Sequence, residues 1–473
     1  MTPPRRPNVV WIVSDDHGYA DRSRLGIHPE VKTPALDRLA DEGVSCTEAY
    51  VSAPICSPSR AGIVSGTHQR RWGVRWFDDA AFPPDDLPTV AERFRDNGYA
   101  TGYLGKVHYG PERPGDRACP ENHGFGESFY GLAGMQQGRL NYLRHSDAAV
   151  AEYGPEASWR MAVQPMFDDG ESTELEGFLT GELGERARDF VERNAEGPFF
   201  LQLAFNAVHN FCWQLPADEL AARGLPPHED WDPDVSTYLD WYDGAISPAL
   251  EHGREYYLAQ LELMDTEIGR LLDTLDALGL AEDTLVVYTT DNGGSTCNYG
   301  DNTPLAGTKY TLWEGGIRVP LIVRWPGGGL PAGVERDGLV STLDLMPTSL
   351  AAAEVDSAQW SHCDGVDQLA HWRGDESSRH EALHWDCGFQ WAVRDSRHKL
   401  RFADGESATA KAIEQVEHAR PGDGLALYDL REDPGETKDL AAELPEVVAR
   451  LRAAWETWPA LQGLRGETVG ERC

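Results

Sequence analysis

The chain has 473 residues, with 42 Lys or Arg against 78 Asp or Glu, so its formal net charge at pH 7 is −36. Such an acidic excess argues against a nucleic acid, an anionic membrane or any extended polyanion as partner. Because single cores stop growing near roughly 250–300 residues, this length predicts one large domain and one smaller one.

The first residues, M-T-P-P-R-R-P-N, precede only a short apolar run, so no signal-peptide hydrophobic region is expected. No apolar run approaches the ~20 residues that span a bilayer. The 8 cysteines lie far apart without a C-x-x-C pair, which favours neither a zinc site nor a disulfide framework. As the sequence stands we expect a cytoplasmic location, or a periplasmic or secreted one if a leader was removed.

The first predicted strand covers residues 8–14 and ends at two adjacent carboxylates. Its apolar run is typical of a parallel strand buried on both faces. Asp15 and Asp16 follow directly, and they would repel each other unless a divalent cation neutralised both; a solvated turn is the alternative. Thr33 and Pro34 then predict the start of a helix that stops near Gly43. This strand, loop and helix predict the start of a doubly wound sheet.

Residues 54–66 read P-I-C-S-P-S-R-A-G-I-V-S-G and place Cys56 where a helix should begin. Pro54 and Pro58 fix the backbone around the cysteine, and the small residues that follow allow a close approach. A helix N-terminus favours an oxyanion. The ordinary interpretation of an isolated cysteine is a buried apolar thiol, which remains the alternative here.

A short helix over 90–97 and a strand over 99–104 lead to Lys106 and His108. Residues 113–170 are irregular, with no role assigned. A helix is predicted over 179–194, then a strand over 199–205 followed by His209. The acidic, aromatic insertion 210–252 is either a specificity loop over the pocket or a surface excursion.

A long amphipathic helix over 257–275 precedes another buried strand, residues 284–290, which ends at Asp291 and Asn292. Two strand ends that carry oxygen ligands at one sheet edge predict a site for a hard cation. Toward the C-terminus, strands are predicted over 382–386, 390–402 and 427–430, and a final helix over 447–455.

Several stretches together resemble the formylglycine-dependent sulfatases of the alkaline phosphatase superfamily. They are C-S-P-S-R at Cys56, G-Y-x-T-x-x-x-G-K-x-H at residues 98–108, and N-T-P-L-A-G-T-K-Y-T-L-W-E-G-G-I-R-V-P at residues 302–320. The resemblance implies an alkaline-phosphatase-like α/β fold, a doubly wound mixed sheet flanked by helices. It assigns residues 1–350 to a catalytic domain and residues 351–473 to a smaller α+β domain with an antiparallel sheet and a helix.

The same resemblance implies the site chemistry. A formylglycine-generating enzyme would oxidise Cys56 to formylglycine, whose hydrated aldehyde is the nucleophile. A calcium ion, ahead of magnesium or manganese, would be held by Asp15, Asp16, Cys56, Asp291 and Asn292.

Charged side chains complete the implied mechanism. Arg60 and Lys106 would orient and stabilise the nucleophile, because charge spreads over the sulfuryl oxygens in the transition state. His209 or Lys309 would protonate the leaving alcohol, and His108 would deprotonate the second hydroxyl.

These features predict a sulfatase that acts on a sulfated mono- or oligosaccharide. Trp72, Trp76 and three tryptophans of the 210–252 insertion could form a stacking wall for a sugar, whereas the charge of −36 would repel a densely sulfated polymer. The alternatives are a broad arylsulfatase, a phosphonate or phosphate ester hydrolase of the same superfamily, and an anion-binding protein with unmodified Cys56.

Overall fold

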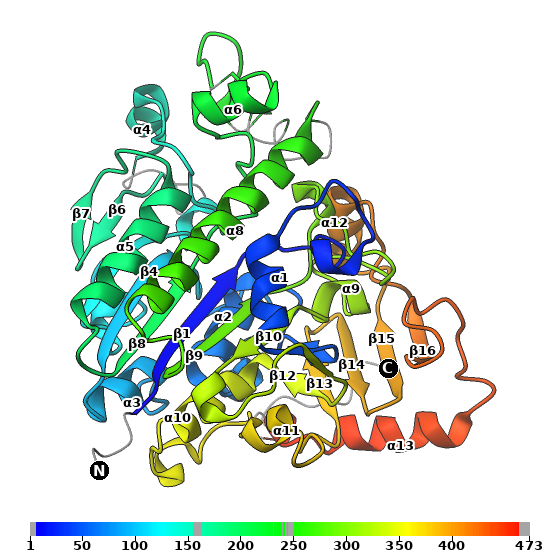
Figure 1. Cartoon of the computed structure of the whole chain (residues 1–473). Coiled ribbons are helices and arrows are strands. Elements are labelled where there is room, and N and C mark those ends of the chain that lie inside the picture. Colours follow the sequence, from blue (N-terminus) through cyan, green and yellow to red (C-terminus); the bar gives the residue numbers. More distant parts are fainter. Residues whose placement is uncertain are drawn as a thin grey trace, which may run out of the picture.

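The computed structural model describes residues 6–462, apart from 155–162, 230, 239, 242–243 and 245–249. Ten strands form one sheet in the order β11-β2-β10-β9-β1-β8-β4-β5-β6-β7. Figure 1 shows this sheet crossing the molecule beneath the long helices α5 (Leu179–Arg193) and α8 (Gly253–Ala277). Among the described residues, no helix has both the length and the apolar character needed to cross a bilayer.

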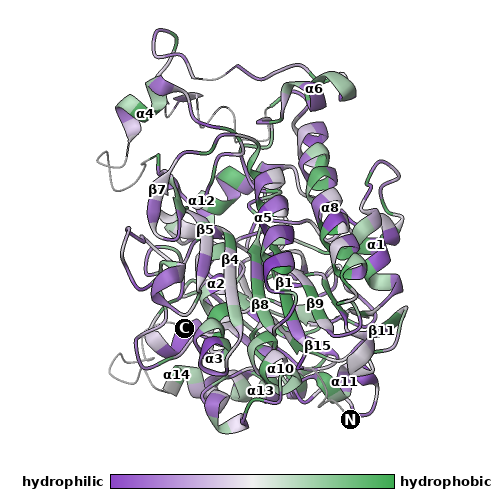
Figure 2. Ribbon diagram, turned by 60° about the vertical axis from the view of Figure 1, so that its left-hand side comes forward, coloured by the Kyte–Doolittle hydropathy of each residue, from purple (hydrophilic) through white to green (hydrophobic). Residues whose placement is uncertain are grey.

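The centre of the sheet is parallel. Strand β1 (Asn8–Ser14) lies between β8 (Phe199–Ala204) and β9 (Thr284–Thr290), and β8 pairs in turn with β4 (Ala100–Val107), which pairs with β5 (Glu127–Leu132). All of these pairs run parallel, so the carboxyl ends of the strands meet at one edge of the sheet. In Figure 2 the central strands are coloured mostly as hydrophobic, as expected for strands covered on both faces.

Shorter strands flank this centre. On one side, β10 (Leu321–Arg324) is antiparallel to β9 and to β2 (Val44–Cys46), and β11 (Val334–Arg336) is parallel to β2. On the other side lie β6 (Met166–Asp168) and β7 (Glu171–Thr173), both antiparallel to their neighbours. The sheet is therefore mixed, as predicted.

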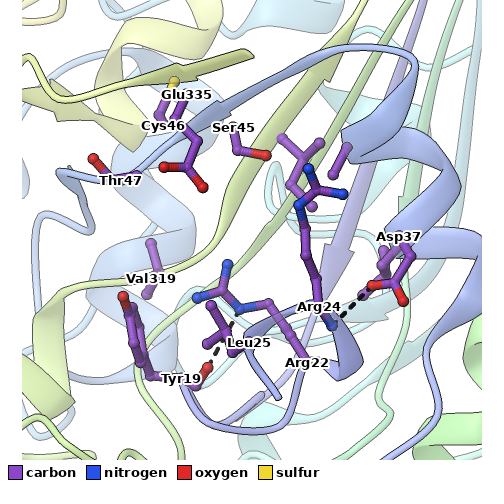
Figure 3. Close-up of a pocket in the computed structure, with 13 residues that line it drawn as sticks. Tyr19, Arg22, Arg24, Leu25, Asp37, Ser45, Cys46, Thr47, Val319 and Glu335 are labelled. Carbon is purple, nitrogen blue, oxygen red and sulfur yellow. Dashed lines mark hydrogen bonds between the residues drawn. The ribbon is translucent and has the colours of Figure 1, made fainter. Parts of the chain in front are cut away.

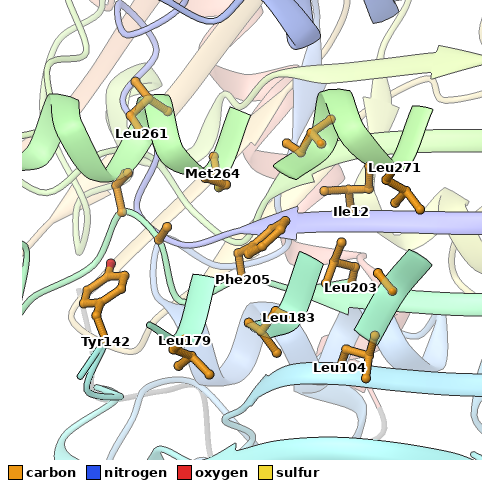
Figure 4. Close-up of a cluster of buried hydrophobic side chains, with 14 of the residues drawn as sticks. Ile12, Leu104, Tyr142, Leu179, Leu183, Leu203, Phe205, Leu261, Met264 and Leu271 are labelled. Atoms are coloured by element: carbon orange, nitrogen blue, oxygen red, sulfur yellow. The ribbon is translucent and has the colours of Figure 1, made fainter. Parts of the chain in front are cut away.

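Alternate residues of β1 pack into two different cores, because successive side chains of a strand point to opposite faces. Val10 and Ile12 join the cluster formed by α5, α8 and α1 (Pro34–Asp41), part of which is shown in Figure 4. Val9 and Trp11 join the cluster formed by α2 (Cys56–Ser65), α3 (Val90–Asp96) and α10 (Leu345–Ala352). Helices on both faces confirm the doubly wound α/β prediction.

The C-terminal part forms a separate antiparallel sheet, also as predicted. Its strands are β13 (Leu383–Asp386), β14 (Gln390–Arg394), β15 (His398–Ala403) and β16 (Gly424–Asp429). Helices α12 (Ala408–Glu417) and α13 (Pro445–Glu456) accompany it. The predicted boundary after residue 350 falls inside α10, and the division into domains stays a prediction. The remaining short elements are β3 (Ala49–Tyr50), α4 (Asp147–Tyr153), α6 (Ala217–Arg223), α9 (Glu314–Ile317), β12 (Val340–Ser341), α11 (Leu369–Arg373) and α14 (Pro459–Gln462).

Three local expectations were wrong or incomplete. Residues 113–170 are not irregular throughout, because they supply β5, β6 and α4. Strand β4 continues to Val107, so Lys106 lies within the strand rather than after it. In the insertion 210–252, Trp213 and Trp231 are buried and belong to the core beside α8, so they do not form a stacking wall. The pattern of apolar residues could not separate core from surface aromatics there.

Candidate active site

The carboxyl ends of β1 and β9 bring four predicted site residues together. The register pairs Ser14 with Thr290, so the two residues that follow each strand lie side by side. Asp16 accepts a hydrogen bond on Oδ1 from Asn292 Nδ2 at 2.6 Å, and its backbone N–H donates to Asp291 Oδ1 at 3.3 Å. Asp15, Asp16, Asp291 and Asn292 are all completely buried.

Cys56 is the first residue of α2 and is almost fully buried. Each of Asp15, Asp16, Cys56 and His209 places a potential ligand atom within 4.8 Å of the others. Burial raises the pKa of the Cys56 thiol, although Lys309 and Lys106 oppose the shift. The structure therefore gathers the predicted nucleophile with two of the predicted ligands and with His209.

Each buried carboxylate has its own cation. Lys106 forms an ion pair with Asp15, Lys309 Nζ lies 2.8 Å from Asp16 Oδ1, and Arg60 Nε lies 2.7 Å from Asp291 Oδ2. Burial raises the pKa of Asp15 to about 7, and the nearby Asp291 adds to the effect. Burial opposes the charge of Lys309, but Asp16 outweighs it and raises the pKa of the ammonium group.

Two oxygens just after β1 and β9 have no hydrogen-bond partner among the residues that the structure describes. They are Asp15 Oδ1 and Asn292 Oδ1, and both are buried. A buried oxygen without a partner is costly, whereas a hard divalent cation coordinates this kind of ligand. The donor set of carboxylate and amide oxygens therefore fits calcium, magnesium or manganese better than a metal that prefers sulfur or nitrogen.

Two histidines complete the group. His209 Nε2 lies 3.2 Å from Lys309 Nζ and 3.5 Å from Asp16 Oδ2. His108 directly follows β4, and its ring packs so tightly on Gly138 that a Cβ at that position would lie 2.7 Å from His108 Cε1. Burial and the neighbouring lysines lower the pKa of both histidines well below the ordinary range. All of the predicted site residues thus lie in one buried cluster.

Some residues that shape this cluster were not predicted. Asn298 donates a hydrogen bond to Asp16 Oδ2, and Glu417 of α12 holds the loop that precedes Asn298. The Asn210 side chain, next to His209, is buried, and within the described ranges neither of its amide atoms has a hydrogen-bond partner. No local motif marks Asn298 or Glu417, because their partners are distant in the sequence.

The aromatic surroundings differ from the expected stacking wall. Trp76 is buried beside Cys56, with its ring 6.0 Å from Tyr310 and 5.1 Å from Phe389. Trp72 packs against the core and donates its indole N–H to the Ala81 carbonyl. Trp76 therefore lies near the site, but its ring is packed against protein.

Comparisons with known proteins identify the family of this chain. The model of the family described as "Sulfatase" matches residues 7–355, and that of "N-sulphoglucosamine sulphohydrolase, C-terminal" matches residues 308–457. Steryl-sulfatase of Mus musculus is 30% identical, covering 93% of this chain and 79% of the relative. Arylsulfatase A of Homo sapiens is 29% identical, with coverages of 95% and 87%. The crystal structure of Ps i-CgsB in complex with k-i-k-neocarrahexaose superposes with a TM-score of 0.76 at 25% identity, covering 96% of this chain and 93% of that one.

Proposed function

This chain belongs to the sulfatase family and is a sulfuric ester hydrolase, and we propose that it hydrolyses the sulfate ester of a mono- or oligosaccharide through a formylglycine made from Cys56. One observation carries the proposal: Cys56 begins α2 and lies with Asp15, Asp16 and His209 in a group whose ligand atoms are all within 4.8 Å. A helix N-terminus beside buried cations is an environment in which an oxyanion is stabilised.

Oxidation by a formylglycine-generating enzyme would convert Cys56 to an aldehyde during maturation. Its hydrate supplies two geminal hydroxyls, one to attack sulfur and one whose deprotonation releases sulfate. Arg60 and Lys106 pair with the buried carboxylates Asp291 and Asp15, and they would stabilise negative charge on the nucleophile and on the sulfuryl oxygens.

A divalent cation, calcium ahead of magnesium or manganese, would be held by Asp15, Asp16, Asp291, Asn292 and residue 56. It would polarise a sulfate oxygen and acidify the attacking hydroxyl. The unpartnered oxygens of Asp15 and Asn292 support this assignment. Asp291 supplies its carboxylate from the second strand end, where Arg60 fixes its orientation.

Two proton transfers belong to side chains of this chain. The leaving oxygen takes a proton from Lys309 or His209, whose nitrogens lie 3.2 Å apart beside Cys56. His108 then accepts the proton of the second hydroxyl. Its Nδ1 has no hydrogen-bond partner in the described part of the protein, which leaves this atom available as a base.

The proposal of a sugar substrate does not depend on the predicted stacking wall of tryptophans, and two comparisons support it. The C-terminal family model is described as that of N-sulphoglucosamine sulphohydrolase, and the Ps i-CgsB structure holds a neocarrahexaose. The net charge of −36 disfavours a long, densely sulfated polymer at low salt. A sugar that carries few sulfates satisfies both conditions.

Turnover of a substrate panel tests the proposal. The panel contains sulfated monosaccharides, glycosaminoglycan disaccharides, intact sulfated polymers, nitrophenyl sulfate and nitrophenyl phosphate. We expect the highest kcat/KM on a small sulfated sugar. Efficient turnover confined to the nitrophenyl sulfate, or preference for an intact polymer, would refute the substrate proposal, and preference for the phosphate ester would refute sulfatase specificity. The mass of the peptide that contains Cys56 tests its oxidation directly.

A further inference from the structure

A pocket lies apart from the buried cluster of predicted catalytic residues. It has a volume of 150 Å³ and opens between the loop that follows Asp16, helix α1 and the ends of β2 and β10 (Figure 3). A cavity volume of about 10–15 Å³ suffices for one water molecule, so this pocket is large enough for a small ligand. None of the predicted catalytic or metal-binding residues lines it.

Arg22, a partly buried arginine, lines this pocket. The Arg22 guanidinium stacks over the Tyr19 ring, 4.7 Å from its centroid, and Nε donates to the Tyr19 carbonyl at 3.3 Å. In the part of the chain that the structure describes, no carboxylate pairs with Arg22, and the groups that favour its charge are the hydroxyls of Tyr19 and Tyr288. A partly buried cation without a counter-charge is unfavourable.

A second guanidinium makes the environment of Arg22 more positive. Arg318 lies over the same Tyr19 ring, 5.8 Å from its centroid. Arg318 forms an ion pair with Glu48 at 2.8 Å, so the Glu48 carboxylate neutralises Arg318 and not Arg22. Burial above all, with a further contribution from Arg318, lowers the pKa of Arg22.

The carboxylates that line the pocket do not neutralise Arg22. Asp37 uses its two oxygens to accept from Ser23 Oγ at 2.7 Å and from the Arg24 backbone N–H at 3.1 Å. Glu335 is exposed, and Figure 3 shows it beside Cys46, on the opposite side of the pocket from Arg22.

Two further donors face the same space. In Figure 3 the Ser45 hydroxyl points toward the Arg24 guanidinium, which borders the pocket above Arg22 and forms an ion pair with Asp41 through one terminal nitrogen. Arginine forks and hydroxyl groups bind tetrahedral oxyanions through charge-assisted hydrogen bonds. Among the carboxylates that line the space, Asp37 already accepts two hydrogen bonds, which leaves the exposed Glu335 as the one remaining carboxylate.

We propose that this pocket is a second anion site, which binds a free tetrahedral oxyanion such as sulfate or phosphate through Arg22, with Ser45 and the nitrogens of Arg24 that Asp41 does not engage as additional donors. Sulfate is also the product of the catalysed reaction, so the enzyme produces a ligand for this site. The pocket connects to the loop that follows Asn292, because the Tyr19 backbone N–H donates to Asn302 Oδ1 at 3.1 Å and the same oxygen accepts from the Gly294 backbone N–H at 3.0 Å. An anion bound at Arg22 would therefore stabilise the segment that leads away from Asp15 and Asp16.

Anomalous scattering from selenate, a sulfate analogue, locates the site directly. Crystals soaked in selenate should show a peak within hydrogen-bond distance of Arg22, in addition to one beside Cys56. In Arg22→Met the first peak should be lost and the second kept. A peak beside Cys56 alone, in both proteins, would overturn this inference and leave the proposed function intact. A carboxylate found paired with Arg22 in anion-free crystals would also overturn it.

Thermal unfolding supplies an independent readout in solution. In anion-free buffer Arg22→Met should unfold at a higher temperature than the wild type, because an uncompensated cation has been removed. Sulfate and phosphate should raise the Tm of the wild type more than that of Arg22→Met. Arg95→Met is the matched charge control, because Arg95 is an exposed arginine of α3 that pairs with Asp96. Its Tm should rise with these anions as much as that of the wild type.

A sulfated monosaccharide, added to protein with Cys56→Ala to prevent turnover, distinguishes the source of the oxyanion. We expect free sulfate and phosphate to raise Tm in a way that depends on Arg22. The sugar ester should not produce this Arg22-dependent rise in Tm. Equal sulfate responses of the wild type and Arg22→Met would contradict the proposal, as would a response that depends on Arg22 with the sugar ester alone.

Discussion

Glu417 is expected to support catalysis from the C-terminal part of the chain. It is the last residue of α12, and its carboxylate reaches the loop that follows β9. Oε1 accepts from Ser295 Oγ at 2.6 Å, and Oε2 accepts from the Thr296 backbone N–H at 2.7 Å and from Thr308 Oγ1 at 3.2 Å. Thr308 directly precedes Lys309. Replacing Glu417 by alanine should therefore loosen Lys309 as well as the loop.

The size of the effect follows from the bonds that are lost. Among the described residues, alanine leaves the Ser295 hydroxyl and the weaker donor Cys297 N–H, 3.4 Å away, without an oxygen acceptor. The Thr296 N–H keeps only Thr308 Oγ1, at 3.1 Å. Each unsatisfied buried donor costs about 1–3 kcal/mol, so we expect a loss of about 2–5 kcal/mol in the free energy of unfolding. Glutamine keeps one oxygen acceptor and the shape of the side chain. Burial raises the pKa of Glu417, so the site favours a neutral group, and glutamine should cost less than about 1 kcal/mol.

Denaturant unfolding and steady-state kinetics on a sulfate ester test this prediction. Glu417→Ala should lower kcat at least about tenfold, equivalent to about 1.4 kcal/mol, while Glu417→Gln should stay close to the wild type. The matched control is Glu414→Ala on the same helix, where the carboxylate forms only an exposed ion pair with Arg420. It should change neither quantity appreciably. If alanine and glutamine behave alike at residue 417, the hydrogen-bond argument is wrong.

Four further outcomes are expected. Cys56→Ala should fold normally and lose turnover, and residual sulfatase activity would contradict its role as nucleophile. Asp291→Asn should lose bound metal and activity together, which metal analysis alongside kinetics would show, and full metal occupancy would remove it from the ligand set. His209→Ala should slow a sugar sulfate far more than nitrophenyl sulfate, because the aryl oxide hardly needs a proton; equal losses would exclude it as the donor. Burial lowers the pKa of His68 to about 3 and of His384 to about 4. Between about pH 6.5 and pH 4 the unfolded chain therefore binds protons that the folded protein does not, so Tm should fall as the pH drops from about 6.5 toward 4. A Tm that stays constant over that range would contradict this prediction.

The sequence was informative where strong local patterns meet simple topology. A buried apolar run that ends in Asp15 and Asp16, and a second that ends in Asp291 and Asn292, predict two strand ends at one sheet edge. The parallel pairing of β1 and β9 places them there. Their assignment as metal ligands remains a prediction, because adjacency alone does not identify a ligand.

The parts that could not be predicted depend on distant partners or on weak patterns. Strand β6 has only three residues, too few for a periodic signal. Trp213 and Trp231 lie in an acidic segment, yet they pack into the core beside α8. Glu417 contacts residues more than a hundred positions earlier, and nothing near it in the sequence marks that contact.

The arrangement of charges explains how so acidic a chain can act on an anion. At the site, each carboxylate is matched by one cation: Asp15 by Lys106, Asp16 by Lys309, and Asp291 by Arg60. The protein groups alone are therefore close to neutral, and a bound divalent cation would make the site positive. The net charge of −36 is that of the whole chain, and at physiological salt exposed charges are screened beyond about 8 Å. A single sulfate that enters the buried site would thus be attracted by the local cations. A long polysulfate would in addition be repelled by the acidic remainder of the chain. This difference favours small sulfated sugars over intact polymers as substrates.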